Sequence, residues 1–197
     1  MLRKIGLFVE DVGHETFITA LLTRLAREQK IEIICQPFNV RGGHGKVITE
    51  LKDYLRDFER GHIQPQDLLI VATDANCKGF QERKQEFSPL TQKTTLPIIY
   101  AIPDPHIERW LLLDSAAFKQ TLGKGCKAPD KKCQKDRYKR LLIEAVHDAG
   151  VIPLLGGIEY AKDIVNAMNL RKTAQKEASL GHLLQALNAQ LKLWKIP

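Results

Sequence analysis

Apolar and polar segments alternate along the first two thirds of the chain in a way that predicts strands followed by helices. Short, unbroken apolar runs are typical of strands buried on both faces of a parallel sheet, whereas apolar residues three and four positions apart indicate helices. Repeated strand–helix alternation implies right-handed crossovers, with helices on both faces of the sheet. The predicted fold class is therefore α/β. Strands are expected at Ile5–Val9, Ile31–Val40, Leu68–Ala72 and Leu96–Ile102, and helices over Phe17–Leu25, Val47–Phe58 and His106–Phe118.

The last third of the chain differs in kind, because its apolar residues recur only at helical spacing. Helices are expected at Tyr138–Ala149, Glu159–Met168 and Ser179–Leu193, with GVIPLLGG and LRKTAQKEAS as the connections between them. No internal repeat is visible. The sequence therefore predicts an α/β domain over residues 1–122, and a basic loop with a helical extension over residues 123–197 that packs on it.

Acidic residues follow three of the predicted strands. Asp74 follows the apolar run Leu68–Ala72, Glu10 and Asp11 follow the first strand, and Asp104 and Glu108 follow the last. In open α/β sheets ligands bind beyond the carboxyl ends of the strands, so these acids are candidates for chemistry, Asp74 first among them. The plainer interpretation stays open, since Asp commonly caps turns and helices and an acid in the first turn of a helix is stabilised by the helix dipole.

Charge is unevenly distributed and favours an anionic partner. The formal net charge is +7, and the segment Gly123–Arg140 holds eight Lys or Arg against two Asp. Summed positive charge attracts phosphates, although a lysine-rich loop is also typical of an ordinary solvated surface. The turn Arg41–Lys46, RGGHGK, has glycines that let backbone amides approach an anion before a helix, but it lacks the Walker spacing and also fits a plain tight turn.

Composition limits the cellular setting. With 44% hydrophobic residues, the 197-residue chain has enough apolar side chains to form its own core. No apolar run is long enough to cross a bilayer and no signal peptide is visible, so a cytoplasmic protein without a membrane partner is expected. The cysteines show no CxxC spacing and are too few for a disulfide scaffold, so free thiols are expected, and a metal shared by two of them is not favoured. These cysteines are Cys35, Cys77, Cys126 and Cys133.

A hydrophobic strand ending in Glu, a strand ending in a variant of DxD and helices between them resemble the Toprim domain of topoisomerases, primases and overcoming-lysogenization-defect nucleases. The resemblance covers nearly the whole chain and points to a prokaryotic family related to that domain, with a Toprim/Rossmann-like parallel sheet. It is carried by LFVEDVGHETFITALLTRL, RGGHGK, IVATDAN, IPDPHIERWLLLD, APDKKCQKDRYKRLL and LLGGIEYAKDIV.

The resemblance implies a Mg²⁺ or Mn²⁺ site for phosphodiester chemistry. Glu10, Asp74 and Glu108 match the catalytic acids of the family, and converging carboxylates repel one another unless a cation is present. Hard divalent cations select oxygen ligands and can polarise a phosphoryl oxygen or supply a hydroxide nucleophile. The metal ligands expected on this basis are Glu10, Asp74, Asn76 and Asp104.

The chain departs from the family pattern at Asn76, which replaces the second Asp of DxD and supplies only a neutral oxygen. Asp104, Glu108 or Asp11 are candidates to compensate; weaker metal affinity and a degenerate site are the other interpretations. Secondary candidates for the site are Asp11, His14 and Glu15, and His106 also flanks the proposed acids and is a candidate to orient water.

The leading functional hypothesis is a Toprim-type nuclease that cleaves DNA or RNA, acts in defence against mobile elements and works with a partner ATPase, as the resemblance implies. The residues expected to bind the phosphate backbone are Arg41, Lys46, Lys78, Lys131 and Lys132. The main alternative is a non-catalytic adaptor or regulatory subunit with the same fold, in which Asn76 reflects lost metal chemistry. A receiver-like phosphoacceptor and a nucleotide-handling transferase were weighed as further alternatives, and the 64-residue gap from Glu10 to Asp74 argues against the receiver.

Overall fold

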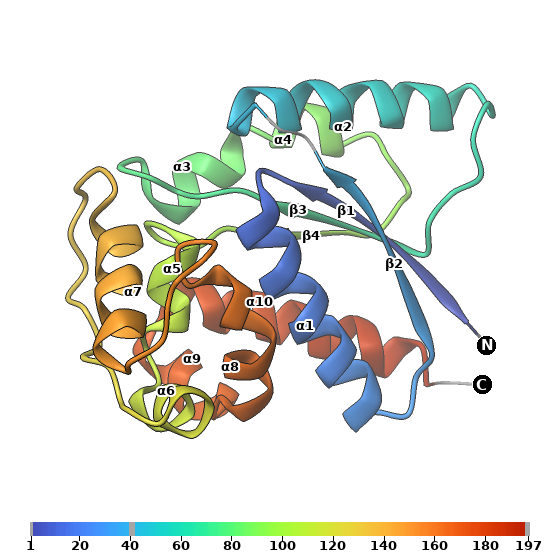
Figure 1. The fold of residues 1–197 in the computed structure, drawn as a ribbon. Helices are drawn as coiled ribbons and strands as arrows, with labels where there is room; N and C mark the ends of the chain where they lie inside the picture. The colour runs from blue at the N-terminus through green and yellow to red at the C-terminus, as the bar shows by residue number, and fades with distance from the viewer. Residues whose placement is uncertain (1, 40–41, 196–197) are drawn as a thin grey trace.

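The computed structural model describes residues 2–39 and 42–195 and contains a four-stranded parallel sheet flanked by helices, as predicted (Figure 1). The strand order is β2-β1-β3-β4. Strands β1 and β3, which are not consecutive in the sequence, therefore pair in the middle of the sheet. The strands are β1 (Arg3–Val9), β2 (Ile33–Asn39), β3 (Leu68–Ala72) and β4 (Ile98–Ala101). Val40, the last residue of the second predicted strand, lies outside the described residues.

Helices cover both faces of the sheet (Figure 1). Helices α2 and α4 pack on one face, and α1 with most of the later helices packs on the other. The helices are α1 (Val12–Glu28), α2 (His44–Glu59), α3 (Gly79–Gln85), α4 (Ser88–Thr91), α5 (Ile107–Leu111), α6 (Ser115–Leu122), α7 (Arg137–Asp148), the 3₁₀ helix η1 (Ile158–Tyr160), α8 (Ala161–Ala167), α9 (Leu170–Lys176) and α10 (Ala178–Leu193).

The two apolar clusters of the protein follow from the alternation of side chains along the buried strands. Leu7 and Val9 of β1 belong to the larger cluster with α1, whereas Phe8 between them belongs to the smaller cluster with α2. In β3, Ile70 and Val71 divide in the same way. Because both faces are covered, the central strands are apolar without interruption, which is why they could be read from the sequence.

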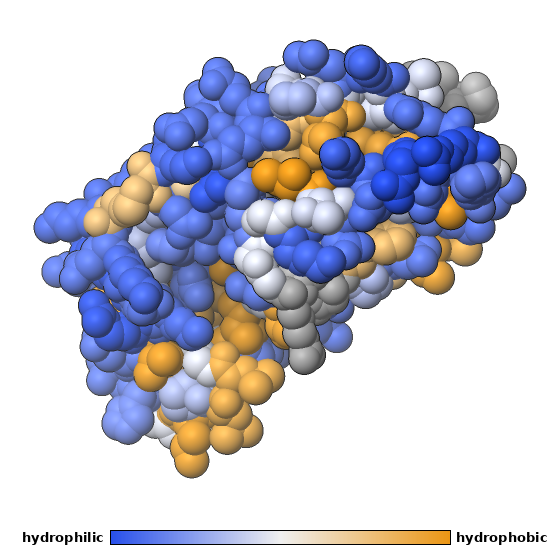
Figure 2. Space-filling model, turned by 90° about the horizontal axis from the view of Figure 1, so that it is seen from above, coloured by the Kyte–Doolittle hydropathy of each residue, from blue (hydrophilic) through white to orange (hydrophobic). Residues whose placement is uncertain are grey.

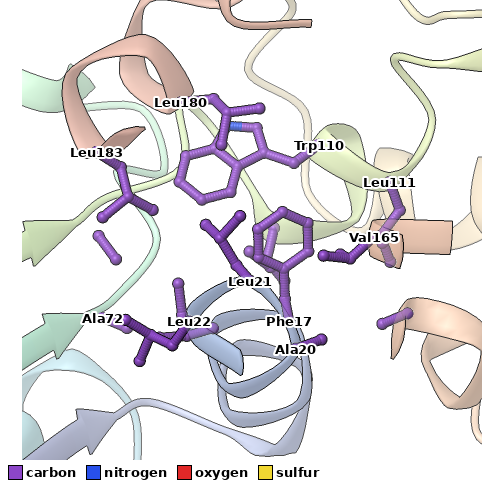
Figure 3. Packing of buried hydrophobic residues seen from close by; sticks show 14 of the residues in the cluster. Phe17, Ala20, Leu21, Leu22, Ala72, Trp110, Leu111, Val165, Leu180 and Leu183 are labelled. Atoms are coloured by element: carbon purple, nitrogen blue, oxygen red, sulfur yellow. The ribbon is translucent and has the colours of Figure 1, made fainter. Parts of the chain in front are cut away.

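Trp110 belongs to the larger cluster and is fully buried. Figure 3 shows its indole between Phe17 of α1 and Leu180 of α10. The ring centroids of Phe17 and Trp110 are 5.3 Å apart, and the indole Nε1 donates a hydrogen bond to Ser179 Oγ at 3.2 Å. One side chain thus joins α1, α5 and α10.

The C-terminal helices share this core. Buried residues of α7, α8 and α10 belong to the same cluster as β1, β3 and α1. In addition, Arg24 of α1 donates hydrogen bonds to the carbonyl oxygens of Val165 and Met168 at 2.7 and 2.6 Å. The extension is therefore joined to the α/β part by side-chain packing and by hydrogen bonds from the Arg24 side chain to backbone carbonyls.

Two local predictions were wrong. The segment expected to connect the last two helices contains α9, whose N-cap Asn169 accepts a hydrogen bond from Lys172 N at 3.0 Å. The single helix predicted over His106–Phe118 is divided into α5 and α6, because Asp114 caps the start of α6 by accepting from Ala116 N and Ala117 N at 3.1 and 3.2 Å. Side-chain capping of this kind is a local effect that apolar periodicity does not register.

Two of the four cysteines are also not free. Cys77, just after the β3 loop, forms a disulfide with Cys133 in the basic loop, with the Cα atoms 5.3 Å apart. The two residues are 56 positions apart in sequence, so their proximity depends on how the basic loop folds back over the sheet edge. Cys35 and Cys126 remain free thiols, as expected.

The outer face seen from the α2 side is largely hydrophilic, with hydrophobic side chains exposed only over limited areas (Figure 2). Among the described residues, no helix has both the length and the apolar character needed to cross a membrane.

Candidate metal centre

The predicted acids meet where the central strands end. Because β1 and β3 are parallel neighbours with Val9 opposite Ala72, the residues that follow them leave the sheet at the same edge. The backbone continues this pairing by one step, since Glu10 N donates to Ala72 O at 3.0 Å. This edge lies toward α3, α5 and α7 in Figure 1. Glu10 and Asp74 are therefore brought together by strand register, as the sequence analysis expected.

Glu10 is fixed by hydrogen bonds to one of its carboxylate oxygens. Its Oε2 accepts from Thr73 Oγ1 at 2.5 Å and from Asp74 N at 3.0 Å. Thr73 is fully buried, and its hydroxyl also lies 3.1 Å from Nδ1 of His44, the first residue of α2. The Glu10 carboxylate is thus held across the ends of both central strands and next to the amino end of α2.

Asp74 is the most heavily hydrogen-bonded acid of the site. Its Oδ1 accepts from His14 Nε2 at 3.1 Å and from Ile107 N at 2.9 Å, and its Oδ2 lies 2.8 Å from His106 Nδ1. Burial acts to raise the pKa of Asp74, but the neighbouring histidines outweigh it and the pKa is lowered. Asp74 is therefore an anion that the fold supports from three sides.

His14 joins two carboxylates in the interior. It is fully buried, and its Nδ1 lies 2.8 Å from Asp11 Oδ1 while its Nε2 faces Asp74. Burial alone would lower the pKa of the imidazole, but the charges and hydrogen bonds of Asp74 and Asp11 raise it well above 6.5. Both ring nitrogens then act as donors, so His14 is a buried cation that positions Asp74.

Asp11 has a second role as the N-cap of α1, where its Oδ1 accepts from His14 N at 3.0 Å. Burial opposes ionisation, but the contacts with His14 lower the pKa of Asp11 to about 2. Glu15 lies in the first turn of the same helix. Asp11 therefore fits both interpretations of an acid that follows a strand, since it caps a helix and also contacts a residue of the site.

Three side chains form a group that can hold a metal ion: Asp74, His106 and Glu108. One donor atom from each lies within 4.8 Å of the other two. His106 is the N-cap residue of α5 and Glu108 lies in its first turn, so the start of this short helix delivers both side chains to Asp74. Of these three residues, Asp74 was predicted as a metal ligand, Glu108 as a catalytic acid and a candidate to compensate for Asn76, and His106 only as a candidate to orient water.

The electrostatics of this group favour an added positive charge. Burial, and then the charge of Asp74, raise the pKa of Glu108 above its usual 4.5. The hydrogen bond to Asp74 raises the pKa of His106 above 6.5. Asp74 thus favours the protonated forms of His106 and Glu108. For the two carboxylates this is the behaviour expected of crowded acids that a divalent cation would neutralise.

A pocket of about 490 Å³ opens beside the group and is lined by Glu10 and Glu108, with Lys139 of α7 and the turn Gly42–Gly43. Gly43 is the N-cap of α2 and has a φ of 75°, and a Cβ atom added there would lie 3.7 Å from Glu10 Oε1. The glycine turn therefore does lie next to the acids. A helix amino terminus in this place suits an anion.

Asp104 and Asn76, the other predicted metal ligands, have different surroundings. Asp104 Oδ2 lies 2.5 Å from Lys131 Nζ, and its backbone N donates to Ser179 Oγ at 3.3 Å. Asn76 adopts a left-handed turn with φ of 53°, and its N donates to Pro105 O at 3.0 Å. Neither residue belongs to the group formed by Asp74, His106 and Glu108.

The predicted phosphate-binding lysines are each paired with an acid, and Arg41 lies outside the described residues. Lys46 pairs with Glu50 at 2.5 Å and Lys132 with Asp130 at 3.0 Å, in addition to the Lys131–Asp104 pair. Lys78 pairs with Glu86.

The sequence analysis missed Lys139, which lines the pocket. Within residues 2–39 and 42–195, Lys139 makes no ion pair. It was one basic residue among many in its segment, and only the docking of α7 singles it out.

A buried network behind the pocket fixes α5. Arg109 pairs with Glu177, and the Glu177 Oε1 atom accepts from Ser179 Oγ at 2.6 Å. The Ser179 hydroxyl in turn accepts from Trp110 Nε1 and from Asp104 N. The start of α10 thus holds the helix that carries His106 and Glu108. No local sequence pattern predicts this network, because Arg109 and Glu177 are more than 60 residues apart in the sequence.

Comparisons with known proteins give a family but no activity. Neither the search of curated proteins nor the search of solved structures found a match. The family described as "Domain of unknown function (DUF4276)" matches residues 9–188, which include every residue of the candidate metal centre. On the strength of this match over most of its length, the chain belongs to the DUF4276 family.

Proposed function

We propose that this protein is a metal-dependent nuclease of the Toprim type that hydrolyses phosphodiester bonds in nucleic acid. The observation that carries the proposal is the convergence of Asp74, His106 and Glu108 within 4.8 Å, next to a pocket that Glu10 and Lys139 also line. Acids that bind a cation and a cation that binds phosphate are the two components that phosphodiester chemistry requires. Action against mobile elements and a partner ATPase remain predictions from the Toprim resemblance.

In this proposal Asp74, His106 and Glu108 would hold the metal ion, which would supply Lewis-acid activation of the phosphoryl group and of water. Glu10 accepts the proton of the attacking water, because one of its oxygens is anchored to Thr73 and Asp74 while the carboxylate still lines the pocket. Lys139 and the amino end of α2 bind the phosphate oxygens. One water is consumed as one P–O bond breaks.

Of the two predicted cations, we propose that Mn²⁺ binds to this group more tightly than Mg²⁺ does. Mg²⁺ binds almost entirely through oxygen, whereas the group contains one imidazole, which suits transition-metal ions. The His106 nitrogen therefore adds affinity for Mn²⁺ that it does not add for Mg²⁺. In this proposal His106 also replaces the carboxylate that the second Asp of DxD would supply, since the chain has Asn76 at that position.

The alternative of a non-catalytic adaptor is supported by Asn76 and by the lysines. Asn76 stabilises a turn, because its backbone is left-handed and its N–H donates a hydrogen bond to the Pro105 carbonyl. The described lysines that were expected to bind phosphate form ion pairs with acids of the protein itself. An adaptor that has kept the fold needs neither a metal nor a substrate. The two candidates therefore differ in a single measurable property, metal-dependent cleavage.

The test is a cleavage assay on single-stranded oligonucleotides, linear duplex and closed circular DNA, and on RNA, with Mn²⁺, Mg²⁺ or EDTA. The expected result is cleavage that requires a divalent cation, is faster with Mn²⁺ and is lost in Glu108→Gln. Glu144→Gln is the matched control, since Glu144 is exposed on α7. Absence of cleavage on every substrate would favour the adaptor, and cleavage in EDTA would contradict the metal mechanism.

A further inference from the structure

Exposed apolar side chains gather around the pocket of the candidate metal centre. In the described part of the chain the large hydrophobic side chains that remain exposed are Leu2, Val12, Ile34, Ile152, Leu154, Leu155 and Leu193. Val12 and Leu155 line the pocket itself, and Ile152 and Leu154 belong to the same loop as Leu155. Single exposed hydrophobics need no explanation, but a group at the rim of a site indicates a contact surface.

The loop of residues 151–157, here called the apolar loop, presents three of these side chains. Ile152, Leu154 and Leu155 are 73%, 81% and 64% exposed. These values are high for side chains whose burial would stabilise the fold. Leu155 lines the pocket that Glu10 and Glu108 also line, and the more exposed Leu154 precedes it in the chain.

The apolar loop is held in place rather than loosely attached. Val151 N donates to Val146 O at 3.3 Å, and Gly157 is buried so closely against α7 that an added Cβ would lie 2.9 Å from Leu142 and Val146 side chains. Gly157 also has a φ of 89°, which glycine adopts without strain. The two ends are fixed while the tip stays in solvent, so the loop is preorganised for an intermolecular contact.

The charge next to the apolar loop is mixed. The pocket is lined by Glu10, Asp11 and Glu108 and by the cation Lys139, which is exposed in the first turn of α7 with Arg140 following it. In the proposed function a bound metal ion offsets these acids, so that the pocket accepts a phosphate. Apolar side chains next to cations match a partner that offers flat apolar surfaces joined by anions. A nucleic-acid strand has this chemistry, with base faces for Leu and Ile and phosphates for Lys and Arg.

We infer that the apolar loop contacts the faces of unstacked bases next to the phosphate in the pocket, so that the site takes single-stranded or frayed nucleic acid rather than closed duplex. Base faces are hidden inside a continuous duplex and exposed in a single strand. The inference rests on the proposed function, because it assumes that nucleic acid is the substrate. It adds the substrate class and assigns a role to Ile152 and Leu154.

The test uses cleavage-resistant phosphorothioate oligonucleotides with 2-aminopurine in a single-stranded overhang, with a hairpin of sealed duplex as comparison, in the presence of Mn²⁺ so that the metal ion is bound. The variant Ile152→Ser/Leu154→Ser removes the two side chains that do not line the pocket. Leu193→Ser is the control, because Leu193 is 61% exposed at the end of α10. Equal thermal midpoints of all proteins establish that the variants are folded.

The wild type and Leu193→Ser are expected to bind the overhang more tightly than the sealed duplex and to raise the 2-aminopurine fluorescence. In Ile152→Ser/Leu154→Ser the fluorescence rise should disappear and the dissociation constant should increase roughly tenfold, as for the loss of a base-stacking contact. Leu154→Trp should bind the overhang at least as tightly as the wild type, because an indole stacks on bases better than an aliphatic chain does.

Binding and fluorescence that are unchanged in Ile152→Ser/Leu154→Ser would overturn the inference and leave a protein partner as the occupant of the apolar loop. The proposed function would survive that result if metal-dependent cleavage persists. A wild type that binds no oligonucleotide would overturn both the inference and the proposed function.

Discussion

Two neighbouring residues of α5, Glu108 and Arg109, have opposite electrostatic environments. Glu108 points to Asp74, a second carboxylate, and its pKa is raised by burial and by that charge. Arg109 instead pairs with Glu177, and both side chains are less than 10% exposed. The paired charges satisfy each other and join α5 to α10, whereas the like charges leave a demand for a cation. Completed pairing marks structure here, and incomplete compensation marks the candidate site.

The largest expected effect comes from breaking the completed pair. Arg109→Met leaves Glu177 buried without its partner, so the free energy of unfolding should fall by about 3–5 kcal/mol. Chemical denaturation measures this loss. The control is Arg56→Met, whose pair with Asp53 is nearly half exposed on both sides, and which should cost at most about 0.5 kcal/mol. Similar costs for the two variants would contradict the structural role of the Arg109–Glu177 pair.

A smaller loss is expected where a cation already belongs to the site. His14→Gln removes the buried imidazolium between Asp11 and Asp74 and should cost about 2 kcal/mol near pH 6, as for hydrogen bonds to charged groups. Because the folded pKa of His14 is raised above 6.5, its stabilisation is complete below that pH and is lost as the pH rises through the folded pKa.

The difference in stability between the wild type and His14→Gln, both in EDTA, should therefore shrink at alkaline pH. Denaturation curves between pH 6 and 10 give this difference directly. A difference that grows with pH would mean that His14 is neutral in the folded protein.

The smallest expected effect has the opposite sign. Glu108→Gln keeps the shape of the side chain but removes one of two crowded negative charges, so in EDTA the protein should gain on the order of 1 kcal/mol at pH 7. The matched variant Glu144→Gln on exposed α7 should change little. Destabilisation by Glu108→Gln would show that its carboxylate is compensated in a way that the group with Asp74 and His106 does not account for.

The sequence predicts the sheet, and it predicts Asp74 as a candidate metal ligand at the edge of that sheet, for one physical reason. Leu68–Ala72 is apolar without interruption because β3 is covered on both faces, and the acid that follows stands at the sheet edge. Parallel pairing with β1 then brings Glu10 to Asp74. The first step depends on a local pattern that can be read from one sequence, whereas the pairing of β1 with β3 comes from the structure.

What the sequence could not predict depends on how distant segments dock. His106 becomes a candidate ligand only because the start of α5 turns toward Asp74, and Lys139 lines the pocket only because α7 packs beside it. The Cys77–Cys133 disulfide likewise requires the basic loop to fold back over the β3 loop. Periodicity describes one element at a time, so it does not report such contacts.

The central claim is that the crowded acids bind a cation whereas the paired charges do not, and Mn²⁺ titration tests it most directly. Electron paramagnetic resonance of free Mn²⁺ counts bound ions in the wild type, Glu108→Gln and Glu144→Gln. The account predicts one strong site in the wild type and Glu144→Gln, and its loss in Glu108→Gln. A wild type that leaves all Mn²⁺ free, or a Glu108→Gln variant that binds as the wild type does, would contradict it.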